Sequence, residues 1–92
     1  MNTETVINLY RAARERGHIN DTTIDIAKRL AEKHLSTEDD MENLLSFAIE
    51  RAFTRLGKEI ALGNDGEAQH QTIARAVARL YWMQKLSDPN EL

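Results

Sequence analysis

Two pairs of residues in this chain have the spacing Glu-x-x-His, which places a carboxylate and an imidazole on one face of a helix. The pairs are Glu15 with His18 and Glu67 with His70. Di-iron carboxylate bundles use such pairs as metal ligands in the middle of helices. Here Gly17 interrupts the first pair, and the second pair falls in the first turn of a predicted helix. We therefore expect solvated or capping side chains at these positions, with no metal site and no cofactor.

Nucleophilic catalysis finds no better support in the sequence. The chain has no cysteine, and Ser36 and Ser87 lie at predicted helix ends, where helix capping explains them. Ser46 falls on a predicted exposed face with no histidine near it in sequence. The prediction is a protein without enzymatic activity and without a small-molecule substrate.

Two polar segments that could bind ions are better explained as helix ends. The acidic residues 38–40 precede a predicted helix, where carboxylates interact favourably with the positive end of the helix dipole. They lack the alternating spacing and the central glycine of a calcium loop. The segment 63–66, Gly-Asn-Asp-Gly, has no following lysine to bind phosphate and is typical of a connection between helices.

The composition predicts a single small domain, residues 1–92, in the cytoplasm. A chain without cysteine has no disulfide framework, and nothing argues for an oxidising compartment. The N-terminus lacks a signal-peptide pattern, and no apolar run approaches the length of a membrane span. The net charge of −3 disfavours indiscriminate binding to polyanions, although a local basic face remains compatible with it.

The hydrophobic pattern predicts an all-α protein, a small helical bundle of about four helices in which the third and fourth are longest. Gly17 should end the first helix, and Gly57 either interrupts the third or stays helical at a cost of about 1 kcal/mol. The expected helices are 3–16, 21–35, 37–62 and 65–86, followed by a frayed tail, 88–92. Their expected N-caps are Thr3, one of Asn20, Asp21 and Thr22, then Ser36, and finally Asn64 or Asp65.

Each of the first three helices has an apolar stripe that is expected to face the core, while charged neighbours such as Lys28 are expected to be solvated. The second stripe takes in Ile24 or Leu35 according to how that helix sits. The stripes are Val6, Leu9, Tyr10 and Ala13; Ile26, Ala27, Leu30 and Ala31; and Met41, Leu44, Leu45, Ala48, Ile49, Ala52, Phe53, Leu56 and Ile60.

The last helix is apolar on more sides than a surface helix needs. Its core side is Ile73, Ala76, Val77, Leu80 and Gln84, flanked by Tyr81 and Met83. Arg75, Ala78, Arg79, Trp82 and Leu86 project from the opposite side, in a segment without acids. Because Trp and Arg dominate binding hot spots, we predict a partner-binding surface there, with one further contact on the third helix. The alternative is that this helix is central and Trp82 belongs to the core. The predicted partner-binding residues are Arg75, Arg79, Trp82, Leu86 and Phe47.

These features predict a non-enzymatic protein-interaction module, similar in type to the accessory, modulator or inhibitor proteins of bacteria and their phages. It would bind another protein, or a second copy of itself as a homodimer. The alternative is a DNA-binding regulator that uses the basic face of the last helix or a helix-turn-helix within 25–50. Residues 25–31 resemble the first helix of that motif. The helix that follows begins with carboxylates, which would repel phosphates.

Overall fold

The computed structural model describes residues 1–35 and 40–87, and in them it has four α-helices and no strand. The two longest helices, α3 and α4, have 21 residues each. The predicted all-α bundle, with its third and fourth helices longest, is confirmed. None of the described helices is long and apolar enough to cross a membrane. The helices are α1 (Thr3–Glu15), α2 (Asp21–Leu35), α3 (Met41–Ala61) and α4 (Glu67–Ser87).

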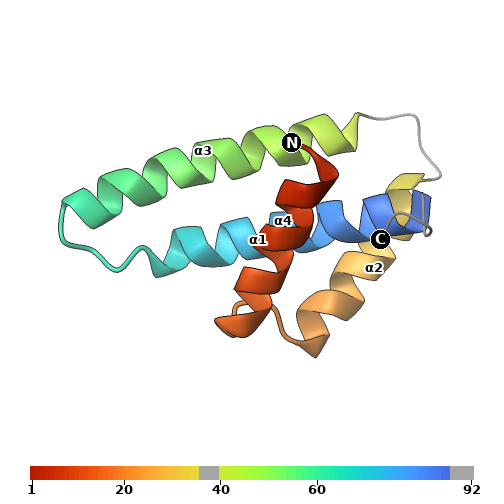
Figure 1. The fold of residues 1–92 in the computed structure, drawn as a ribbon, viewed down its shortest axis with the longest axis horizontal. Helices are drawn as coiled ribbons and strands as arrows, with labels where there is room; N and C mark the ends of the chain where they lie inside the picture. The colour runs from red at the N-terminus through yellow and green to blue at the C-terminus, as the bar shows by residue number, and fades with distance from the viewer. Residues whose placement is uncertain (36–39, 88–92) are drawn as a thin grey trace.

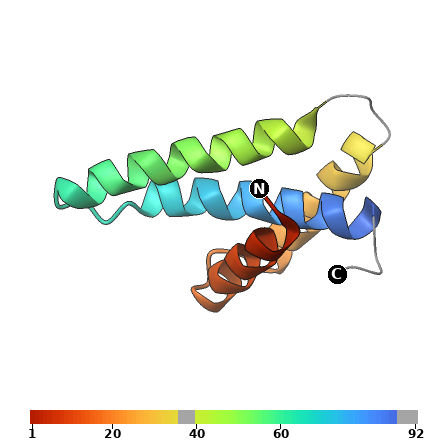
Figure 2. The ribbon, with the colours of Figure 1, turned by 45° about the horizontal axis from the view of Figure 1, so that its top comes forward.

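The central element of the fold is α4. Helix α3 runs antiparallel beside it, and α1 and α2 lie on its other sides. In Figure 1 α1 crosses in front of α4, and in Figure 2 α1 lies below α4 while α2 crosses it, so that the yellow end of α2 lies above α4. Each of these three helices packs on α4, and they make few contacts with one another. This arrangement explains why α4 is apolar around most of its circumference, because three neighbours cover it.

The burial pattern of α4 corrects one part of the sequence prediction. Of the predicted core side, Ile73, Ala76, Val77 and Leu80 are buried and Gln84 is half-buried, and the flanking Met83 is buried too. Ala74 and Ala78 are buried as well. Ala78 was assigned to the side that the core does not need, and its exposure is 0%. That assignment is wrong for Ala78 because α2 packs on this side of α4.

The stripes of α1 and α2 are largely confirmed. In α1, Val6 and Tyr10 are buried, and Leu9 and Ala13 are half-buried against the core. In α2, Ala27 and Ala31 are buried, and Ile24 and Leu30 beside them are half-buried. Ile26 was expected to face the core, yet it is 51% exposed. The prediction for Ile26 is wrong because α2 packs on one neighbour only, so a narrow stripe of its surface is covered.

The same reason corrects the wide stripe of α3. Leu45, Ile49, Ala52 and Leu56 are buried. The other predicted core residues are Met41, which is half-buried, and Leu44, Ala48, Phe53 and Ile60, which are exposed. Because α3 packs on α4 alone, it buries one side and leaves both edges of its apolar stripe in solvent.

Asparagine and aspartate side chains cap the starts of three helices. Asn20 Oδ1 accepts a hydrogen bond from the Thr23 backbone N–H at 2.9 Å, so Asn20 is the cap among the three candidates at α2. Before α4, Asp65 Oδ1 accepts from the Glu67 N–H at 3.0 Å. The prediction of Thr3 as the cap of α1 is wrong. Asn2, whose backbone is extended, accepts from the Thr5 N–H at 2.8 Å, and Thr3 is already helical.

Two of the helix ends follow the same glycine geometry. Gly17 has φ +79°, its N–H donates to the Arg14 carbonyl, and the His18 N–H donates to the Ala13 carbonyl. The α3 end repeats this pattern around Gly63. As a result α1 ends one residue before the predicted 16 and α3 one before the predicted 62. Helix α4 begins two residues later than the predicted 65, after Gly66 with φ +69°, and ends one residue later than 86.

Several predictions lie outside the described residues. These are the cap at Ser36, the acidic residues at 38 and 39, residues 37–39 of the predicted third helix and the tail 88–92. The side chain of Leu35 is likewise not described. The predicted helix 37–62 is wrong at Asp40, because Asp40 has a non-helical backbone and takes the N-cap position, so α3 begins at Met41. The first described turn of α3 follows Asp40, whose Oδ2 accepts a hydrogen bond from Asn43 Nδ2 at 2.8 Å.

Helix α3 continues through Gly57, which answers the question that the sequence left open. No atom of the surrounding structure lies within 4 Å of a Cβ built at this glycine. We therefore expect Gly57→Ala to raise the free energy of unfolding by about 0.5 to 1 kcal/mol, because alanine loses less backbone entropy on entering a helix. Urea denaturation followed by circular dichroism measures this. A decrease would mean that α3 is not continuous at this position.

Candidate functional site

A groove of about 600 Å³ lies between α2 and α4, beside the turn that joins α1 to α2. We call it the arginine groove because two arginines of α4 are in its lining. Of the residues that the structure describes, no aspartate or glutamate lines it. Its lining residues are Gly17, His18, Asn20, Thr22, Thr23, Ile26, Ala27, Leu30, Gln71, Arg75 and Arg79.

Helical spacing places these side chains on facing surfaces. Ile26 and Leu30 of α2 are four residues apart, as are Arg75 and Arg79 of α4, so each pair lies on one side of its helix. The buried Ala27 lies on the α2 side of the groove. The groove therefore combines an apolar wall from α2 with a cationic wall from α4.

The two arginines differ in how they are held. Arg75 is exposed, whereas Arg79 is half-buried. Arg79 Nη2 lies 3.0 Å from His34 Nε2 and 3.8 Å from the sulfur of Met41, and its Nε is buried without a hydrogen-bond partner. Arg79 is thus fixed between α2 and the start of α3, while the Arg75 guanidinium is available to a partner.

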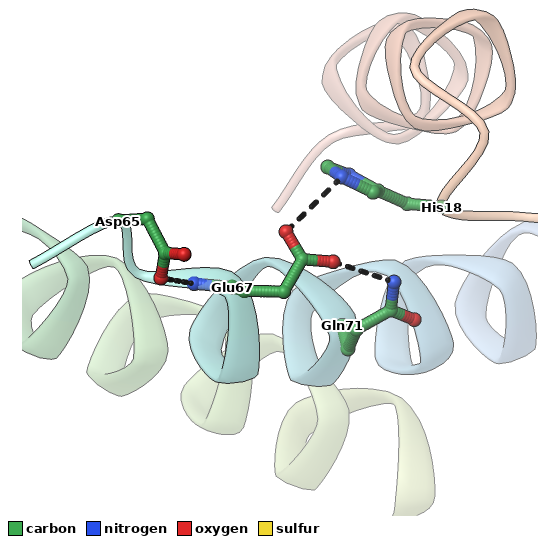
Figure 3. A network of polar contacts seen from close by, with 4 residues as sticks. All are labelled: His18, Asp65, Glu67 and Gln71. Carbon is green, nitrogen blue, oxygen red and sulfur yellow. Dashed lines mark hydrogen bonds and ion pairs between the residues drawn. The ribbon is translucent and has the colours of Figure 1, made fainter.

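His18, which follows α1, lines the groove, and Figure 3 shows its side chain facing Glu67 of α4. His18 Nε2 lies 4.0 Å from Glu67 Oε2, and Gln71 Nε2 donates to Glu67 Oε1 at 3.2 Å. The ring of His70 stacks on that of His18, with centroids 5.3 Å apart. Three members of the two Glu-x-x-His pairs thus meet across the α1–α4 contact. Among the described residues, however, no group of three or more potential ligands is arranged to hold a metal ion.

A second hollow, of about 220 Å³, lies between α3 and α4. Arg51 and Arg55 of α3 line it, together with Thr72 of α4. Because Thr72 and Arg75 are neighbours on α4 and both are exposed, the second hollow and the arginine groove flank one exposed stripe of that helix. Sequence reasoning missed Arg51 and Arg55; their spacing of four residues was the available signal. The lining of the second hollow is Ala48, Arg51, Ala52, Arg55, Gln69 and Thr72.

Phe47, the predicted contact on the third helix, adjoins this second hollow. Its side chain is 60% exposed, and the Arg51 guanidinium carbon lies 5.8 Å from the centre of its ring. Arg75, Arg79 and Phe47 are therefore on, or next to, the same arginine-rich surface.

Trp82 and Leu86 line neither of these two hollows. Trp82 is half-buried against the core, in edge-to-face contact with Tyr81 at 5.5 Å between centroids. The Lys28 and Lys85 ammonium groups lie 4.3 Å and 4.8 Å from the centre of its ring. The prediction that Lys28 is merely solvated is wrong, because its side chain covers Trp82. Leu86 is 38% exposed near the end of α4.

Tyr10 joins the aromatic cluster from α1. Its ring stacks on Tyr81, with centroids 3.9 Å apart. Burial raises the pKa of Tyr10 above its usual value, and this outweighs the lowering effects of Trp82 and of the Arg14 charge. The folded protein therefore holds the phenolic proton more tightly than the unfolded chain does.

The raised pKa of Tyr10 makes the protein sensitive to alkali. The stabilising contribution should be fully present below pH of about 10, the usual tyrosine pKa, and should be lost as the pH rises through the folded-state value. We expect wild type to lose more stability than Tyr10→Phe between neutral and strongly alkaline pH. Urea midpoints of both proteins across this range test it, with Tyr10→Phe as the control for titration of other groups. Parallel losses would contradict the prediction.

The arginine groove can bind anionic groups through guanidinium donors and apolar groups through Ile26 and Leu30.

Comparison of the chain with protein-family models, curated protein sequences and solved structures gives no match.

Proposed function

We propose that this chain is a small protein-interaction module that binds another protein through the arginine groove, and so through the last helix, without catalysing a reaction. The observation that carries the proposal is the exposure of Ile26, 51%, beside two arginines in a groove whose lining, within residues 1–35 and 40–87, contains no carboxylate. Exposed apolar side chains next to arginines are the composition of binding hot spots rather than of an ordinary solvated surface. Such a module fits an accessory or inhibitor protein that modulates its partner.

Capture of partners from a lysate of the native host tests this proposal. We expect the wild-type protein to capture a partner that Ile26→Asp does not capture, because the substitution replaces an apolar contact with a carboxylate. Ile60→Asp is the matched control, since Ile60 is 56% exposed on α3 and lines neither hollow. Equal capture by the two variants would rule the groove out as the binding site. Measuring the mass in solution shows whether the partner is a second copy of the chain.

Nucleic-acid binding is the second candidate, and the observation that favours it is the presence of four arginines around one stripe of α4. A helix-turn-helix within 25–50 gains less support, because α2 and α3 each pack on α4 and have little contact with each other. A DNA-binding titration against salt separates the candidates, since phosphate contacts make affinity fall steeply with salt. An absence of binding at low salt would exclude this function.

A further inference from the structure

We infer that the segment bound by this protein is acidic and amphipathic, and that it crosses the exposed stripe of α4 from the arginine groove to the second hollow. Its carboxylates would meet the guanidinium groups of Arg75, Arg51 and Arg55, and its apolar side chains would pack on Ile26 and Leu30. The inference rests on the proposed function and adds the chemical nature of the partner.

The first argument is the segregation of charge. The chain has 15 acidic and 12 basic side chains and a net charge of −3, yet among the described residues neither hollow has an aspartate or glutamate in its lining. Two described carboxylates contact lining residues: Glu67, beside His18 and Gln71, and Glu59, 3.5 Å from Gln69 Nε2. Glu67 begins α4 and Glu59 is near the end of α3, so both lie towards the turn that joins these helices. The middle of this surface is cationic on an acidic protein.

The second argument is the state of the arginines. Within the part of the chain that the structure describes, Arg51, Arg55 and Arg75 form no ion pair, and all three are exposed. A guanidinium group binds carboxylates with two parallel hydrogen bonds, and its planar fork suits this geometry better than an ammonium group does. Carboxylates of a partner would therefore find donors that no described acid of the chain occupies.

The third argument distinguishes a protein segment from a nucleic acid. The hollows present aliphatic side chains, Ile26, Leu30 and Ala48, and the described residues of the two linings include no phenylalanine, tyrosine or tryptophan. Proteins that bind single strands stack bases on aromatic side chains, and phosphates gain nothing from aliphatic contacts. An amphipathic peptide, in contrast, uses both the aliphatic wall and the arginines.

A library of random short peptides displayed on phage and selected on the wild-type protein tests the inference. We expect the enriched peptides to combine aspartate or glutamate with large apolar residues. Their affinity, measured by fluorescence anisotropy with synthetic versions, should fall with increasing salt because exposed charges are screened.

Charge reversal at the exposed arginines locates the site. We expect Arg75→Glu, and the double variant Arg51→Glu with Arg55→Glu, each to weaken binding about tenfold or more. Arg11→Glu makes the same change of charge on the exposed surface of α1 and should leave the affinity unchanged. Circular dichroism of each variant checks that the helices are retained.

The inference is overturned if no peptide is enriched, if the enriched peptides are neutral or basic, or if Arg75→Glu binds them as wild type does. Short duplex DNA that displaces the peptides and loses affinity in the same variants would assign the surface to nucleic acid instead. A partner from the lysate that is lost with Ile26→Asp but retained with Arg75→Glu would leave the proposed function standing and remove the acidic segment.

Discussion

Gly66→Ala is expected to lower the free energy of unfolding by about 2 to 4 kcal/mol, the sum of a left-handed backbone conformation and an overpacked contact. Gly66 is buried, has φ +69°, and a Cβ at this position would overlap the Leu56 side chain. Leu56 is itself in the core. Either Leu56 or the start of α4 must therefore move. Urea denaturation followed by circular dichroism measures the loss.

Gly63→Ala is the matched control for this experiment. Gly63 has φ +86° in the same connection, but nothing lies within 4 Å of its built Cβ. Gly63→Ala should therefore lower the free energy of unfolding only by the cost of the left-handed backbone conformation, about 1 kcal/mol. If the two variants are equally destabilised, the close contact between Gly66 and Leu56 does not contribute, and the packing of the α3–α4 turn would need revision.

Ala78→Glu is expected to leave the chain unfolded, or to cost at least about 3 kcal/mol, because the new carboxylate would be buried without a partner. Ala78 is fully buried at the centre of α4. Ala68→Glu is the control: Ala68 is exposed on the same helix, and a carboxylate in its first turn is compatible with the helix dipole. Thermal and urea denaturation of both variants give the comparison.

The outcome at position 78 bears directly on how the last helix is used. A stable Ala78→Glu protein with altered association would mean that this side of α4 faces a partner, as the sequence alone suggested. An unfolded variant, beside a folded Arg75→Glu, would place the boundary between core and binding surface between Arg75 and Ala78. Ala78 is expected to belong to the core because Ala27 and Ala31 of α2 are small, and small side chains let α2 approach α4 closely.

Local chemistry made the helices predictable. Glycines at positive φ, Gly17 and Gly63, end α1 and α3 where their lack of a Cβ predicts, and Asn20 and Asp65 cap the helices that follow them. These signals depend on residues within a few positions of one another. They are therefore present in the sequence before any tertiary contact forms. The predicted cap of α1, Thr3, was one residue later than the observed cap, Asn2. This difference depends on which of the two side chains accepts a hydrogen bond from the free N–H groups of the first turn.

Half of the candidate site was predictable in the same way. Arg75 and Arg79 stood out because they share one side of a helical segment, 68–87, that contains no acid, and they do line the arginine groove. Trp82 could not be placed, because its helical position is compatible both with solvent and with a third neighbour. The structure puts it against Tyr81, under the Lys28 side chain. Nothing local distinguishes these two outcomes.

By itself, the sequence of this protein determined four helices, most of their ends to within two residues, and the direction in which each apolar stripe points. Only the tertiary structure decided how much of each stripe is covered, and it leaves Ile26 exposed and buries Ala78. Only the tertiary structure places Arg51 and Arg55 of α3 on the same surface as Arg75 of α4. The physical reason is that helical periodicity specifies a face, whereas burial depends on the number of neighbours. Here α4 has three neighbours and α2 and α3 essentially one each, so the central helix is covered and its partners present the binding surface.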